Sequence, residues 1–183
     1  VPSGKDILDG RQEEGFVVLQ KSIYGKILKD EGYFSTFSAQ DRICIAEHTY
    51  DLGEYLQTLQ EKGEFPSPDS SINGNLVYFP PCHGREQNIG RPYPKILSRI
   101  PNLCLESIDG HFYCCGMAGI MGFKREFHDS SIRLGRRLMD KIEQIHPDRI
   151  VTDCLSCRLQ FNQCLPYPVS HPIEILRETF AGR

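Results

Sequence analysis

Hydrophobic positions in the second half of the chain alternate between short apolar runs and stretches with helical spacing. The apolar runs predict strands over residues 76–79, 103–108 and 150–152. The spaced stretches predict helices over residues 94–100, 130–145, 157–164 and 172–180. A repeated strand–helix order is typical of a parallel sheet, so we expect an α/β fold with a parallel sheet flanked by helices.

The N-terminal third carries a weaker version of this pattern. A short buried strand is predicted over residues 16–19, and helical spacing follows from Ser22 to Glu31. Two further helices are expected, one capped by Ser38 and one opened by Asp51.

The first strand–helix step aligns with the last one, which suggests a degenerate internal repeat. In this alignment Lys21 and Tyr24 stand where the later copy has a pair of cysteines. Residues 66–74 are rich in Pro, Ser, Asp and Gly and are interpreted as a linker. We therefore expect a partial, mostly helical repeat in residues 1–65 and a complete cysteine-rich domain in residues 75–183.

Eight cysteines are many for 183 residues. Five of them form a spaced pattern in which one cysteine is followed after 31 residues by an adjacent pair and after 38 more by CxxC. These five are Cys82, Cys114, Cys115, Cys154 and Cys157. They follow the three predicted strands, and the carboxyl ends of parallel strands lie at one edge of a sheet. We therefore expect all five at one site at that edge.

Metal or cluster ligation explains these cysteines better than a disulfide scaffold or inert buried thiols. No export signal is visible near Val1, and disulfides need an oxidising compartment. That start also suggests a fragment or a processed chain. Cys44, Cys104 and Cys164 fall within apolar patterns and are predicted to be small buried side chains.

Thiolates are the ligands of both iron–sulfur clusters and structural zinc. Gly116 and Gly119 are expected to leave room for backbone to approach a bulky cluster, and His83 and His111 are candidates for contact with it. Five thiols are one more than a tetrahedral ion or a cubane cluster needs. The surplus favours a larger or unusual cluster, or one free thiol. His171 is expected to cap a helix or to contact the ligand residues, rather than to bind the metal or cluster itself.

Charge and motifs exclude several other functions. A net charge of −3 gives no electrostatic footprint for nucleic acid. No Walker, GxGxxG, GxSxG or HExxH motif is present, and no apolar run approaches the roughly 20 residues of a membrane span. A basic run could be a solvated helix face or could dock an acidic partner or anionic lipid. It consists of Lys124, Arg125, Arg133, Arg136 and Arg137.

The order C…CCG…CxxC resembles the cysteine-rich CCG domain. The resemblance includes Pro81-Cys82-His83, CCGMAG from Cys114 to Gly119, Gly122-Phe123-Lys124 and His171-Pro172. That domain occurs in the B subunit of heterodisulfide reductase and in iron–sulfur subunits of flavin dehydrogenases. The form here is most similar to the C subunit of anaerobic glycerol-3-phosphate dehydrogenase. The resemblance implies that the five cysteines bind a [4Fe–4S] cluster, which is noncubane in heterodisulfide reductase.

The resemblance implies electron transfer rather than an independent catalytic site. The implied partners are a flavin-containing dehydrogenase subunit, other iron–sulfur subunits or domains, and quinone at the membrane surface. The implied location is cytoplasmic, with peripheral attachment to the inner face of the membrane as a variant. The alternatives are a cluster-based disulfide reductase module and a structural zinc module that holds subunits together.

Overall fold

The computed structural model describes residues 17–18, 32, 34–119 and 121–180. This part of the chain divides into two compact units. One contains the residues up to Phe65 together with Glu86–Pro92, and the other contains Pro66–Arg85 together with the chain from Tyr93 onward. The predicted helix from Ser22 to Glu31 lies outside the described residues, as do Lys21 and Tyr24.

The N-terminal unit contains helices that begin where the sequence predicts. Helix α3 (Ala39–Glu47) is capped by Ser38, whose hydroxyl accepts from the Asp41 N–H at 3.1 Å. Helix α4 (Leu52–Glu61) starts with a capping box between Asp51 and Glu54. Strands β1 (Val17–Val18) and β2 (Thr49–Tyr50) pair in parallel. Both predicted N-caps are confirmed.

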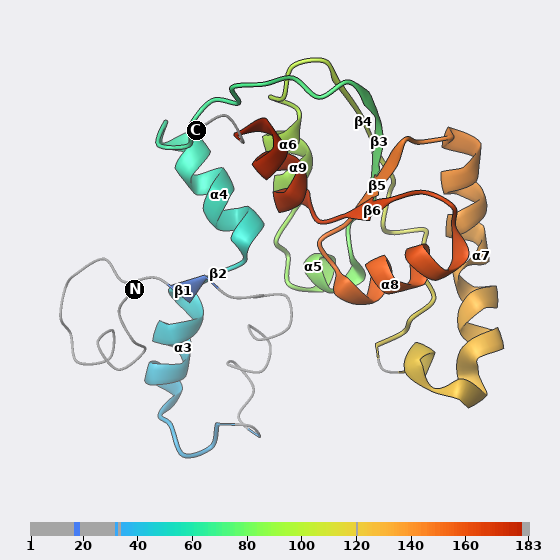
Figure 1. The fold of residues 1–183 in the computed structure, drawn as a ribbon. Coiled ribbons are helices and arrows are strands. Elements are labelled where there is room, and N and C mark those ends of the chain that lie inside the picture. The colour runs from blue at the N-terminus through green and yellow to red at the C-terminus, as the bar shows by residue number, and fades with distance from the viewer. Residues whose placement is uncertain (1–16, 19–31, 33, 120, 181–183) are drawn as a thin grey trace. The chain divides into compact units, whose positions relative to one another are not determined.

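The C-terminal unit is an α/β structure built on a parallel sheet (Figure 1). Its strands are β3 (Gly74–Tyr78), β4 (Leu103–Ser107), β5 (Arg149–Val151) and β6 (Val169–Ser170). Their order across the sheet is β4-β3-β5-β6, and every neighbouring pair is parallel. The predicted fold class is confirmed.

Helices connect these strands. They are α5 (Cys82–Glu86), α6 (Pro92–Leu97), α7 (His128–Ile145), α8 (Leu155–Cys164) and α9 (Pro172–Thr179). Two short 3-10 helices, η1 (Met121–Phe123) and η2 (Arg125–Phe127), precede α7. The predicted segments 94–100, 130–145, 157–164 and 172–180 correspond to α6, α7, α8 and α9, whereas α5 and β6 are additional.

Alternating residues at the end of the central strand β3, and Phe79 just after it, face two different helical layers. Val77 and Phe79 belong to a core with Leu138, Met139 and Ile142 of α7 and Phe161 of α8. The Phe79 and Phe161 rings meet edge to face, with their centroids 5.9 Å apart. Cys115 and Cys157 are members of the same core, so it lies directly beneath the cysteine-rich segments.

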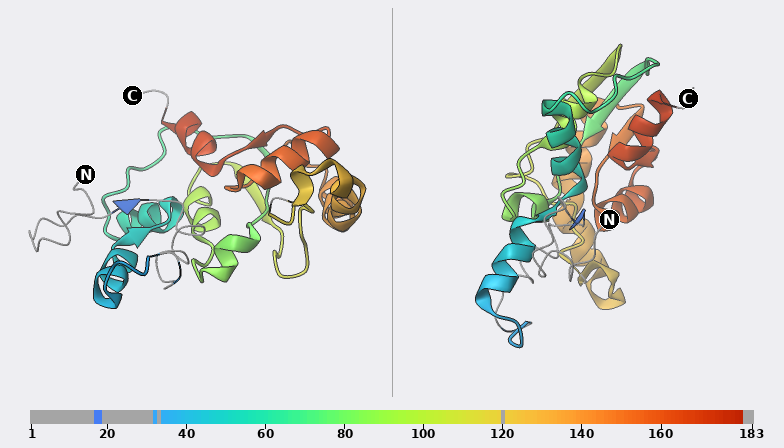
Figure 2. Two further views of the ribbon diagram at one scale, coloured as in Figure 1. Left: turned by 90° about the horizontal axis from the view of Figure 1, so that it is seen from below. Right: turned by 90° about the vertical axis from the view of Figure 1, so that its left-hand side faces the viewer.

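The other face of β3 is covered by a second layer. Tyr78 packs against Tyr93 of α6 at a centroid distance of 6.4 Å, and Tyr93 meets the His171 ring at the start of α9. In Figures 1 and 2, α6 and α9 lie together, apart from α7. The sheet is therefore sandwiched between helices, as a parallel sheet requires.

Candidate cysteine-lined site

The sheet topology brings the cysteine motifs to one edge. Because all four strands are parallel, their carboxyl ends point the same way. Cys82 opens α5 shortly after β3, and Cys154 is the N-cap of α8 shortly after β5. The adjacent pair Cys114 and Cys115 lies in the long connection between β4 and α7.

The thiols lie close to one another and none is disulfide-bonded. Cys157 Sγ is 3.1 Å from Cys115 Sγ, and all eight cysteines are free. Two backbone amides donate to the remaining sulfurs. The Gly116 N–H donates to Cys114 Sγ at 3.4 Å, and the Cys157 N–H donates to Cys154 Sγ at 3.5 Å. Amide donors of this kind stabilise thiolate and cluster sulfur alike.

The thiols shift one another's protonation. Hydrogen bonds from the Cys114 and Cys157 thiols lower the pKa of Cys115 to about 3, and a hydrogen bond from Cys157 lowers the pKa of Cys154. The pKa values of Cys114 and Cys157 are raised, chiefly because each gives its proton to a neighbouring sulfur. The site therefore favours thiolates at Cys115 and Cys154.

Cys82 completes the group from the exposed side. Burial raises the pKa of Cys82 first, and the negative charges of Cys115 and Cys154 raise it further. The charge of Cys82 therefore interacts with sulfurs of both the CCG motif and the CxxC motif. The structure thus places thiols of the CCG and CxxC motifs in contact, with Cys82 linked to them through charge, and a bound cation would relieve their mutual repulsion.

The CCG loop is held by contacts that the sequence analysis missed. Gly116 has φ +98°, and a Cβ there would overlap the Ser131 carbonyl oxygen. The Ser131 hydroxyl donates to the Gly116 carbonyl at 2.9 Å, and Gln160 Nε2 donates to the Ser131 hydroxyl at 3.1 Å. A Cβ on Gly135, inside α7, would overlap the Cys115 carbonyl oxygen. Gly135 lies in a helix interior, where glycine is unfavourable, and that position is the feature of the sequence that could have indicated its packing role.

The candidate histidines occupy three different environments. His83 Nε2 is buried and has no hydrogen-bond partner among the described residues. Burial lowers the pKa of His83, while the charge of Cys115 acts in the opposite direction, so this imidazole lies near the thiols. The His111 side chain is exposed. His171 is the N-cap of α9, its Nδ1 accepting from the Ile173 N–H at 3.1 Å, which confirms the predicted cap.

Other predicted positions differ from expectation. Gly119 is exposed with φ +68°, and no atom lies within 4 Å of the place that a Cβ would take, so the backbone angle rather than crowding favours glycine. The prediction that Cys104 is buried is wrong, because β4 is an edge strand and leaves this side chain exposed. Cys44 and Cys164 are half-buried rather than buried.

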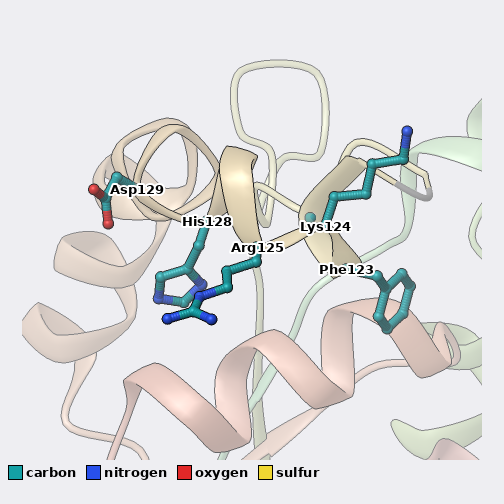
Figure 3. Close-up of a pocket in the computed structure, with 6 residues that line it drawn as sticks. Phe123, Lys124, Arg125, His128 and Asp129 are labelled. Carbon is teal, nitrogen blue, oxygen red and sulfur yellow. The ribbon is translucent and has the colours of Figure 1, made fainter.

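A basic pocket of about 380 Å³ lies beside the CCG loop (Figure 3). Its lining residues are Gly122, Phe123, Lys124, Arg125, His128 and Asp129. Figure 3 shows Arg125 and His128 extending to the same side, whereas Lys124 points away from them. Two members of the basic run, Lys124 and Arg125, therefore lie shortly after the CCG motif in the chain.

The described ranges hold neither a ready-made site for a single metal ion nor a membrane-spanning helix. No group of three or more His, Cys, Asp or Glu side chains there has the arrangement that one ion needs. No helix in the same ranges has the length and apolar character of a membrane span.

Comparison with known proteins identifies relatives of this segment. Residues 76–162 match the family model described as a cysteine-rich domain, CCG. The chain is 35% identical over 106 residues to the C subunit of anaerobic glycerol-3-phosphate dehydrogenase from Escherichia coli, covering 58% of this chain and 26% of the relative. It is 30% identical over 95 residues to the B subunit of fumarate reductase (CoM/CoB) from Methanothermobacter marburgensis, covering 51% and 19%.

A third relative extends the similarity over more of the chain. The chain is 27% identical over 158 residues to the glycolate oxidase iron-sulfur subunit of Escherichia coli, covering 85% of this chain and 36% of the relative. The chain thus spans between 19% and 36% of the length of these three relatives. No solved structure gives a significant match.

Proposed function

We propose that residues 76–162, which match the cysteine-rich domain model CCG, bind an iron–sulfur cluster. The proposed ligands are Cys82, Cys114, Cys115, Cys154 and Cys157. The observation that carries the proposal is the 3.1 Å contact between Cys157 Sγ and Cys115 Sγ of two different motifs, with Cys82 following the neighbouring strand β3. A cubane [4Fe–4S] cluster needs four thiolates, and the resemblance to heterodisulfide reductase implies a noncubane [4Fe–4S] cluster as the use of the fifth.

The surroundings of the thiols fit such a group. The Gly116 and Cys157 amides already donate to sulfur, and His83 Nε2 is a buried polar atom with no partner among the described residues. We infer that His83 donates to cluster sulfur, and that Gly116 and Gly119 keep the loop backbone close to the cluster. His111, being exposed, would contact only its outer edge. When bound, the cluster takes up and releases single electrons.

The names of the relatives support a role within a larger oxidoreductase. One is a dehydrogenase subunit and another is called an iron-sulfur subunit. We propose that this chain carries electrons from a flavin-containing dehydrogenase subunit, through other iron–sulfur subunits or domains, toward quinone. That role places the chain in the cytoplasm or on the inner face of the membrane.

A cluster-based disulfide reductase is the second candidate. In this candidate four of the cysteines hold the cluster and the fifth stays free, because a free thiolate beside a cluster can exchange with a disulfide substrate. Similarity to the B subunit of the CoM/CoB fumarate reductase also supports this candidate. A paramagnetic signal that changes when a thiol substrate is added would favour disulfide chemistry, and a signal that does not change would favour electron transfer alone.

Replacement of single cysteines tests the ligand assignment. Cys82 and Cys104 are both exposed, so Cys82→Ser and Cys104→Ser should leave the fold intact. We expect Cys82→Ser to lower the iron and acid-labile sulfide bound by anaerobically prepared protein, and Cys104→Ser to leave both unchanged. Equal losses would refute the assignment. A colourless protein with one zinc per chain would instead support the structural zinc module.

A further inference from the structure

The exposed apolar side chains of the C-terminal unit gather on the segments that carry the cysteines. Six large hydrophobic side chains are exposed in the described part of this unit. They are Phe112, Met121, Phe123, Leu134, Leu155 and Leu159. All belong to the CCG connection, α7 or α8, and the described parts of α5, α6 and α9 contribute none.

Four of these side chains lie on the chain segments that carry the proposed ligands. Phe112 is 70% exposed and precedes the cysteine pair by two residues. Leu155, 65% exposed, lies between Cys154 and Cys157, and Leu159 is one helical turn further along the same face of α8. Phe123, 58% exposed, follows the CCG loop. Single exposed apolar side chains are normal, but several that gather on neighbouring segments are typical of an interaction surface.

A basic border accompanies this apolar surface. Residues 121–137 contain five basic and two acidic side chains, a net charge of +3 in a chain whose total is −3. The Arg137 guanidinium lies 5.5 Å above the Tyr113 ring, next to the cysteine pair. Arg136 acts to lower the pKa of Cys164, against the larger effect of burial, so it reaches the end of α8. The border therefore extends from the CCG loop to α8.

These basic side chains are available to a partner. The ion pairs found among the described residues of the C-terminal unit join Arg149 to Glu178 and Arg158 to Glu174, and do not include the border. Figure 3 shows the Arg125 guanidinium and the Phe123 ring extending toward the side on which α8 lies. Apolar groups bordered by arginines are typical of protein interfaces, in which arginine is enriched.

We propose that this surface docks the acidic face of a redox protein. We define the docking face as Phe112, Phe123, Leu155 and Leu159 with the basic border Arg125, Arg136 and Arg137. The inference rests on the proposed function and deepens it, because it names where the electron enters. A donor seated there would lie on the segments that carry Cys114, Cys115, Cys154 and Cys157. One electron leaves a reduced flavin in the donor, which is oxidised, and reduces the cluster.

Electron transfer from an acidic surrogate tests the docking face. The probe is reduced flavodoxin, an acidic flavin protein, mixed with the iron–sulfur-loaded 183-residue chain in a stopped-flow spectrometer. The test variant is Arg136→Glu/Arg137→Glu. The matched control is Lys95→Glu/Arg99→Glu, which makes the same charge change at exposed positions in and after α6.

The test variant should lower the second-order rate constant at low salt by about tenfold or more, because steering by complementary charge raises association rates by about 10–10³. The difference should shrink in about 1 M salt, where the screening length falls to about 3 Å. The control should react like the unaltered chain. Leu155→Ser/Leu159→Ser, at exposed positions, should slow the reaction at both salt concentrations.

Equal rates in the test and control variants would overturn the proposal. The proposal would also be overturned if the chain self-associated and Leu155→Ser made it monomeric. Binding to phosphatidylserine vesicles through the docking face, with no effect of the variants on flavodoxin rates, would overturn it as well. Dithionite, a small reductant, must bleach the cluster equally in every variant. If dithionite bleaches nothing in the unaltered chain, the proposed function fails, and titration with oxidised flavodoxin still tests the docking face by itself.

Discussion

Gly135 offers a test in which the structure reverses the usual effect of a substitution. Glycine within a helix is less favourable than alanine by about 1 kcal/mol, so Gly135→Ala in α7 would ordinarily stabilise the chain. Here the new Cβ would overlap the Cys115 carbonyl oxygen and lie 2.9 Å from the Met139 methyl carbon. Met139 is fully buried, and the carbonyl belongs to a loop whose Gly116 carbonyl accepts from the Ser131 hydroxyl, which Gln160 in turn holds, so neither group can move freely.

Overpacking a well-filled core costs about 1–3 kcal/mol, and a backbone atom in the way favours the upper end of that range. Set against the gain in helix propensity, the expected result for Gly135→Ala is a net loss of about 1–2 kcal/mol in the free energy of unfolding. Gly84→Ala in α5 is the matched control. Its Cβ would meet only Pro81 Cγ, at 3.9 Å, and we expect it to be neutral or to stabilise by up to about 1 kcal/mol.

Guanidinium unfolding under reducing conditions, followed by far-UV circular dichroism, measures both variants. Iron content gives a second readout, because displacement of the Cys115 backbone should also lower cluster binding in Gly135→Ala and not in Gly84→Ala. If Gly135→Ala stabilised the chain as much as its control, the close packing of α7 against the CCG loop would be refuted.

Two further predictions concern the support of the site. Burial, followed by the charge of a nearby arginine, lowers the pKa of His171. The neutral imidazole that caps α9 therefore stabilises the fold above the unfolded pKa of about 6.5. This stability should be lost as the pH falls below that value. The slope of unfolding free energy against pH in that range should flatten in His171→Asn, which keeps a cap acceptor, and persist in His146→Asn, at an exposed position. Ser131→Ala leaves the buried Gln160 amide without its acceptor and should lower the free energy of unfolding by about 1–3 kcal/mol. Ser130→Ala, at an exposed position, should change that free energy by less than about 0.5 kcal/mol. Equal effects of the two variants in chemical denaturation would contradict the buried hydrogen-bond network.

Elements with a long hydrophobic period could be predicted from the sequence. The helix expected over residues 130–145 is α7, His128–Ile145, because its apolar face continues over successive turns. Local cap chemistry was equally readable at Ser38, Asp51 and His171. The resemblance to the CCG domain is confirmed by the match over residues 76–162.

Short elements and long-range contacts could not be predicted in the same way. β6 has two residues and α5 has five, too few to show a period. Exposure of Cys104 follows from the position of β4 at the sheet edge, and strand order is not a local property of the sequence. The contacts of Gly135 and Gln160 with the CCG loop join segments far apart in the chain, so their role depends on the packed structure.

The spacing of the five cysteines did carry the main feature of the site. Parallel strands deliver Cys82 and Cys154 to one edge, and the loop after β4 adds Cys114 and Cys115. Cluster binding by these thiols is our proposal. Its physical basis is a group of thiols whose charges repel one another until a cation is bound.

Iron and acid-labile sulfide in anaerobically purified chain test that proposal most directly. A [4Fe–4S] cluster predicts about four of each per chain, a brown colour that bleaches on reduction, and loss of both elements in Cys115→Ser. A chain that binds no iron under these conditions, or that holds a single zinc ion and no sulfide, would contradict cluster binding at this site.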